Sequence, residues 1–279
     1  MKSSVGKKTN KNSKKARKVA PKCWYTIRYV LLLTIWVFCS VIVSQVVIGL
    51  IMGLFVGLDQ LNKPVLSGIY SLATYALTLV MVIVIPPRVK EKWFDDAKQK
   101  TKKEAEPKND KQLATSRAKE REQLGLNGLP TWTDIGLSPV AYIISTILAL
   151  GLIYVFNLFP WFNAEESQAT GFNPYMGGGE RAIAFLVLVV LAPIVEEIIF
   201  RGWLYGRLRA RMGIFGSILI TSALFGLLHF QWNVGVNVFA LSVVACVLRE
   251  ITGTIYAGIL THMIKNGVAF YLLYVIGFG

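Results

Sequence analysis

Two adjacent carboxylates lie inside one of the most apolar stretches of this 279-residue chain. Glu196 and Glu197 interrupt a run of aliphatic side chains between Arg181 and Phe200, which is long enough to cross about 30 Å of hydrocarbon at about 1.5 Å per residue. A charged side chain near the middle of a bilayer costs about 2.5–3.5 kcal/mol on insertion scales. Both acids therefore need partners, and ionisable groups kept inside a membrane span are candidates for a functional role.

The first partner lies one helical turn further along the same segment. Arg201 follows Glu197 by four residues, with the acid on the amino-terminal side, which is the favourable order for an ion pair on a helix. Glu196 points about 100° away around that helix and faces a different neighbour. The spacing predicts that Arg201 holds Glu197 and that Glu196 is free for chemistry, although a purely structural ion pair is an equal alternative for Glu197 and Arg201.

The chain has only two histidines, and both fall in apolar segments. If the helices before and after Met212-Gly213 are antiparallel, Glu196 and His229 lie at similar distances from that turn, and hence at the same depth. Phe225 precedes His229 by one helical turn and shares its face, where simple packing explains it best.

A second turn near Gly253 brings the last helix back to the same layer. His262 lies about 15 Å and Asn266 about 20 Å up this helix from the turn, and the two share one face. A buried histidine more often packs than reacts, and an asparagine can simply join two helices. A free acid, two histidines and an amide at one depth nevertheless favour a functional site.

Composition indicates a membrane protein. Hydrophobic residues make up 54% of the chain and charged residues 16%, too apolar a balance for a soluble globule. The net charge of +14 comes mainly from blocks of Lys and Arg beside the apolar runs, so it favours contact with anionic lipid and fixes orientation. We expect membrane lipids as partners and no nucleic acid.

The expected fold is all-α, a polytopic helical membrane protein with about seven transmembrane helices and a four-helix catalytic core. Four parts follow along the chain: a basic tail (1–26), a transmembrane hairpin (27–87), a charged loop (88–136) and the core (137–279). The expected spans cover approximately residues 27–58, 65–85, 137–159, 181–209, 214–230, 234–248 and 254–277. The sixth of these is the shortest and could be re-entrant. The basic segments predict a multi-pass protein of the cell membrane, with the amino terminus and the charged loop in the cytoplasm and the carboxyl terminus outside.

Three motifs in order carry a resemblance to a known family. EEIIFR (196–201), FGLLH (225–229) and HMIKN (262–266) resemble the motifs of the CPBP intramembrane proteases. This family includes type II CAAX prenyl endopeptidases and bacterial relatives linked to bacteriocin processing or immunity. The resemblance covers residues 181–279 and does not extend to residues 1–180.

The resemblance implies an intramembrane endopeptidase acting on a membrane-embedded or lipidated peptide or protein. In that reading Glu196 and His229 activate a water, while His262 and Asn266 stabilise the oxyanion or complete a metal site. Peptide hydrolysis needs such a base, together with positive charge or hydrogen-bond donors where the carbonyl oxygen becomes negative.

The resemblance also assigns supporting positions and leaves the cofactor open. Glu197 and Arg201 organise the first helix, with Phe225 beside them. The reaction uses either zinc or no metal, since the chain has no HExxH motif and an amide is an unusual zinc ligand. The candidate metal ligands are Glu196, His229, His262 and Asn266.

Two other classes of protein remain as alternatives. A transporter or proton relay also places Glu and His inside spans, but it distributes them through the bilayer and often has an internal repeat. A non-catalytic membrane partner, such as a bacteriocin self-immunity protein, could keep the same core. Substitution of Glu196 separates a non-catalytic partner from a protease, because a binding role survives the substitution and hydrolysis does not.

Overall fold

The computed structural model describes residues 22–54, 63–85, 121–166, 170–173 and 175–277. Regular structure in these residues is entirely helical. Six of the helices are long and apolar enough to cross a bilayer, and Ile214–Leu227 forms a shorter apolar helix. The prediction of an all-α fold is confirmed, and the six long helices are consistent with a polytopic membrane protein.

The amino-terminal hairpin consists of α1 (Lys22–Leu54) and α2 (Lys63–Leu79), and α2 continues into the π-helical segment η2 (Val80–Val84). Helix α1 begins within the range predicted as tail. The rest of the basic tail, and the charged loop as far as residue 120, lie outside the described residues.

Helix α5 (Trp132–Phe156) begins five residues before the predicted boundary. Its start is fixed by a capping box, in which the Asp134 amide donates to the Thr131 hydroxyl and the Thr131 amide donates to the Asp134 carboxylate. Such a box satisfies amide groups that have no partner inside the helix. The first turn of α5 was expected to belong to the charged loop, because the apolar run begins only at Leu137. The capping residues start the helix before that run.

The segment before α5 packs against the core. The Arg249 guanidinium donates to the carbonyl oxygens of Gln123 and Leu124 at 2.7 and 2.9 Å. Gly202 permits this approach, because a Cβ there would lie 3.1 Å from the Leu124 carbonyl oxygen. Hydrogen bonds thus join the end of the charged loop to Arg249, and its backbone packs against Gly202 on the helix that carries both glutamates.

That helix is the centre of the fold and runs from residue 178 to residue 209. It comprises α6 (Gly178–Phe185), η3 (Leu186–Leu191), α7 (Ala192–Glu197), η4 (Ile198–Tyr205) and α8 (Gly206–Arg209). Segments η3 and η4 are π-helical, and α7 is the short α-helical segment between η3 and η4. Glu196 and Glu197 are the last two residues of α7. π-Helical turns change the direction of side chains along a helix and are common at functional sites.

The remaining helices are α9 (Ile214–Leu227), α10 (Trp232–Thr252) and α11 (Tyr256–Tyr271), followed by the π-helical η5 (Leu272–Ile276). The structure also differs from the sequence interpretation in the lengths of these helices, because the sixth segment is a full-length helix and the fifth is the short one. Helix α9 ends at Leu227 and the chain turns at Phe230, whose φ is +53°. The turn between α10 and α11 lies at Gly253, with φ +72°, as predicted.

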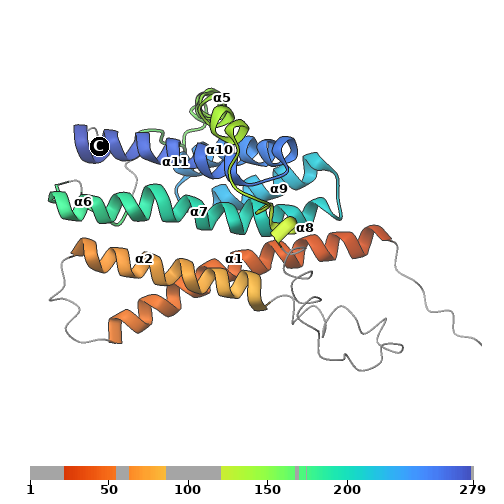
Figure 1. Cartoon of the computed structure of the whole chain (residues 1–279), viewed down its shortest axis with the longest axis horizontal. Helices are drawn as coiled ribbons and strands as arrows, with labels where there is room; N and C mark the ends of the chain where they lie inside the picture. Colours follow the sequence, from red (N-terminus) through yellow and green to blue (C-terminus); the bar gives the residue numbers. More distant parts are fainter. Residues whose placement is uncertain (1–21, 55–62, 86–120, 167–169, 174, 278–279) are drawn as a thin grey trace, which may run out of the picture.

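Figure 1 shows the arrangement in layers. Helices α1 and α2 lie along one side of the long central helix, and α9, α10 and α11 lie along its other side, with α5 packed on α10 and α11. The largest core cluster joins the hairpin, the central helix and α9, through buried residues that include Val37, Val82, Trp203 and Leu224. The central helix is therefore covered on both sides.

Candidate active site

Glu197 and Arg201 form the ion pair that their spacing predicts. The Arg201 Nη1 atom lies 3.0 Å from Glu197 Oε1, and both side chains are 0% exposed. The guanidinium also stacks on the Phe225 ring, with its central carbon 4.5 Å from the ring centroid, a favourable contact between a cation and an aromatic face. Phe225 is itself buried, and it packs between this pair and the two histidines.

The second oxygen of Glu197 is enclosed by α11. A Cβ on Gly258 would lie 3.0 Å from Glu197 Oε2 and 3.5 Å from the Ala245 Cβ. A side chain at residue 258 would therefore crowd Glu197, and the glycine leaves room for it.

Gly258→Ala is expected to lower the free energy of unfolding by about 1–3 kcal/mol, the usual cost of overpacking. Alanine has the better helix propensity by about 1 kcal/mol, so a net loss can come only from the clash. Gly267→Ala on the same helix is the control, because its nearest contact, the Val189 Cγ1 atom, lies at an ordinary 3.6 Å. Thermal unfolding in detergent measures both, and equal stability of the two variants would contradict the proposed fit.

Glu196 faces away from that buried pair, as its angular position predicts. Its Oε1 atom accepts a hydrogen bond from the Tyr75 hydroxyl at 3.2 Å, and its Oε2 atom lies 3.8 Å from His262 Nε2. Its side chain is 18% exposed, whereas that of Glu197 is 0% exposed. The two adjacent acids therefore have different environments, and only Glu196 is open to a reactant.

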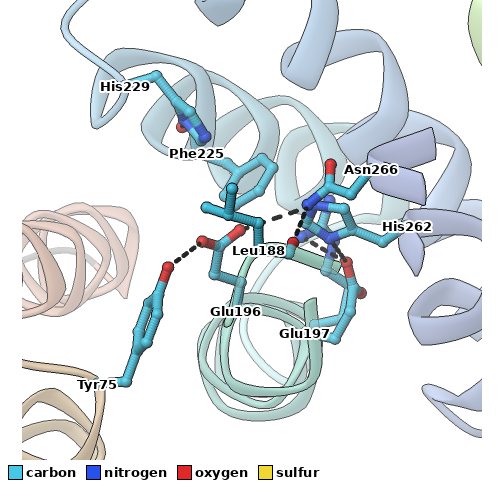
Figure 2. A network of polar contacts seen from close by, with 9 residues as sticks. Tyr75, Leu188, Glu196, Glu197, Phe225, His229, His262 and Asn266 are labelled. Atoms are coloured by element: carbon cyan, nitrogen blue, oxygen red, sulfur yellow. Dashed lines mark hydrogen bonds and ion pairs between the residues drawn. The ribbon is translucent and has the colours of Figure 1, made fainter. Parts of the chain in front are cut away.

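His262 lies between the two carboxylates (Figure 2). Its Nδ1 atom is 3.3 Å from Glu197 Oε1, and its Nε2 atom faces Glu196. Because an ionised carboxylate can only accept hydrogen bonds, Nδ1 carries the proton in this contact. Glu197 thereby fixes the orientation of the imidazole, and the other ring nitrogen faces Glu196.

His229 is held in a similar way by its own backbone. Its Nδ1 atom lies 2.8 Å from the Phe225 carbonyl oxygen, which is an acceptor, so Nδ1 again carries the proton. The Nε2 lone pair is left for another partner. Among the described residues, no hydrogen bond or ion pair joins His229 directly to Glu196.

Asn266 connects α11 to the central helix. Its Nδ2 atom donates to the Leu188 carbonyl oxygen in η3 at 2.8 Å. One hydrogen of the amide is used in this bond, and the second remains available.

These groups line one cavity of about 730 Å³. Its walls come from α1, α2, the central helix, α9 and α11. The lining includes the four predicted residues Glu196, His229, His262 and Asn266. Tyr75 and Lys265 also line it. The sequence interpretation placed its four groups in one layer, and the structure brings them to one cavity.

Sequence reasoning missed Tyr75 and Lys265. Tyr75 lies in the amino-terminal hairpin, where one more aromatic residue in an apolar span gives no signal. Lys265 is an ionisable residue inside a span, next to Asn266, and that signal was available. In the part of the chain that the structure describes, its ammonium group forms no ion pair or hydrogen bond.

The arrangement does not fit a zinc site. Zinc in proteins takes three or four nitrogen, oxygen or sulfur ligands around one point. Within the described ranges, no three His, Cys, Asp or Glu side chains come close enough to share a metal ion. The Asn266 side chain would have to supply a further ligand through its amide oxygen, and an amide is an unusual zinc ligand.

A comparison with known protein families covers the part of the chain that carries Glu196, His229, His262 and Asn266. Residues 178–268 match the family of Rce1-like type II CAAX prenyl endopeptidases. The chain thus carries a domain of this family, which is a family of proteases, and the resemblance of the three motifs is confirmed. A comparison with curated proteins and with solved structures found no match. None of the findings supports a role in bacteriocin immunity.

Proposed function

We propose that this protein is an intramembrane endopeptidase in which Glu196 acts as the general base. The observation that carries the proposal is the contrast between two adjacent acids. Glu197 is buried and paired with Arg201, while Glu196 opens into a cavity that it shares with His229 and His262. A base must be reachable by the proton that it removes, and Glu196 meets this condition.

The reaction begins with a water between Glu196 and His229. The water donates one hydrogen bond to the Glu196 carboxylate and the other to the free Nε2 of His229. Glu196 takes one proton as the water oxygen attacks the peptide carbonyl carbon. The same proton then passes to the leaving amine as the carbon–nitrogen bond breaks, so the carboxylate is restored.

The negative charge on the carbonyl oxygen requires a donor or a cation. The second amide hydrogen of Asn266 and the ammonium group of Lys265 are the available groups at the cavity. Such fixed groups act strongly where water is excluded and the dielectric is low. No step in this scheme passes through a metal ion.

The substrate is a peptide or protein segment within or bound to the membrane. The cavity walls are formed largely by helices long enough to cross a bilayer, so a soluble globular domain cannot reach Glu196. The distribution of Lys and Arg supports an amino terminus in the cytoplasm.

The proposal is tested with purified protein in detergent and a panel of membrane-anchored peptides, comparing the parent with His229→Ala. Loss of the second water partner should reduce kcat by about 10²–10⁴-fold, the usual contribution of a group in general acid–base catalysis. A zinc chelator in a parallel arm should leave the parent rate unchanged.

Two results would contradict this scheme. A His229→Ala rate equal to that of the parent would remove His229 from the reaction. If the chelator abolished the activity of the parent and added zinc restored it, the reaction would depend on a metal ion. The metal-free scheme with Glu196 and His229 would then be wrong.

A further inference from the structure

The amino-terminal hairpin supplies one wall of the cavity, although it lies outside residues 178–268. The contributing side chains include Gln45 on α1 and Tyr70, Thr74, Tyr75 and Thr78 on α2. The family domain alone therefore leaves the cavity open on this side.

Tyr75 is the residue of this wall that reaches Glu196. Its hydroxyl donates to Glu196 Oε1 at 3.2 Å. Figure 2 shows Tyr75 approaching the carboxylate from the side opposite His262. One carboxylate oxygen is thus bound by the hairpin, and the other faces the imidazole.

The position of Tyr75 is set by close packing of α2 on the central helix. Gly68 precedes Tyr75 by seven residues, so the two lie on the same face of α2. A Cβ at Gly68 would be 2.9 Å from the Ile183 Cγ2 atom, so the two helices approach closely at this point. Ser67 adds a hydrogen bond to the Gly171 carbonyl oxygen at 2.9 Å.

We propose that Tyr75 is a positioning residue for Glu196, an inference that rests on the proposed function. A carboxylate turns easily about its last side-chain bond, and a single hydrogen bond to Oε1 fixes that rotation. Oε2 is then held towards His262 and the cavity, ready to receive the proton of the attacking water. The hairpin thereby completes the active site and does more than anchor the chain.

The test compares Tyr75→Phe with Tyr256→Phe. Tyr256 on α11 lies outside the residues that line the cavity, and its hydroxyl donates to the Gly128 carbonyl oxygen. Tyr75→Phe should reduce kcat about 10–100-fold through misplacement of the base, while KM should change by less than about threefold. Tyr256→Phe should retain the parent kcat, and both variants should unfold at the parent temperature. An unchanged kcat in Tyr75→Phe would overturn the proposal.

An infrared measurement makes the inference independent of turnover. The carboxylate stretching band of Glu196 is assigned as the band missing from Glu196→Gln, at one fixed pH. It should shift in Tyr75→Phe and stay in place in Tyr256→Phe, because only the first variant loses the hydrogen bond to Glu196. If the parent cleaves no peptide, the proposed function fails, and this band still decides whether Tyr75 holds the carboxylate. A band that does not move in Tyr75→Phe would overturn the inference.

Discussion

Glu196→Gln is expected to abolish peptide hydrolysis and to leave the fold intact. Glutamine has the shape of glutamate, and its amide oxygen can still accept the hydrogen bond from Tyr75. It cannot take a proton from water, so the loss in kcat should be at least about 10²–10⁴-fold. The side chain is open to the cavity and makes no buried ion pair with an arginine, so the unfolding temperature should not fall.

The measurement is single-turnover cleavage of a membrane-anchored peptide, alongside thermal unfolding in the same detergent. Glu166→Gln is the control, because Glu166 is an exposed carboxylate outside the cavity. A folded Glu196→Gln protein with the rate of the parent would exclude Glu196 as the base. Equal loss of activity in Glu166→Gln would show that the assay responds to charge alone.

Arg201→Met is expected to lower the free energy of unfolding by about 3–5 kcal/mol, because it leaves the buried carboxylate of Glu197 without its partner. Both side chains are fully buried, so water cannot replace the lost contact. Methionine can still pack against Phe225, which limits the effect of lost volume. The cost therefore arises mainly from the uncompensated charge.

The double variant Glu197→Gln with Arg201→Met separates charge from packing. It removes both charges and should recover much of the stability lost in Arg201→Met. Arg209→Met is the matched control, because its ion pair with Glu250 is 40% and 29% exposed, and exposed pairs contribute about 0–1 kcal/mol. If the double variant is less stable than Arg201→Met, the ion pair is not the source of the effect.

Local spacing predicted the parts of the site that lie on one helix. The i, i+4 order of Glu197 and Arg201 is enough to pair them, and the 100° between successive residues is enough to turn Glu196 away. Long apolar runs similarly indicated the helices, because a bilayer leaves few other structures for them. Equal distance from the Met212-Gly213 turn predicted one depth for Glu196 and His229, and both line one cavity.

Contacts between distant helices could not be predicted in this way. The bond from Tyr75 to Glu196 joins residues 121 positions apart, and no periodicity within α2 distinguishes Tyr75 from Tyr70. The proton positions of the two histidines depend on Glu197 and the Phe225 carbonyl oxygen, which only the packed structure brings to them. The start of α5 was missed because a capping box of two polar side chains set it.

The central claim is that Glu196 directs a water molecule onto a peptide bond, and cleavage in ¹⁸O-labelled water tests it most directly. Membrane-anchored peptides are incubated with the parent and with Glu196→Gln, and the fragments are weighed by mass spectrometry. We predict one ¹⁸O atom in the new carboxyl terminus of the parent product, and no product with Glu196→Gln. A folded parent that cleaves none of the peptides, or labelled product at the parent rate from Glu196→Gln, would contradict the claim.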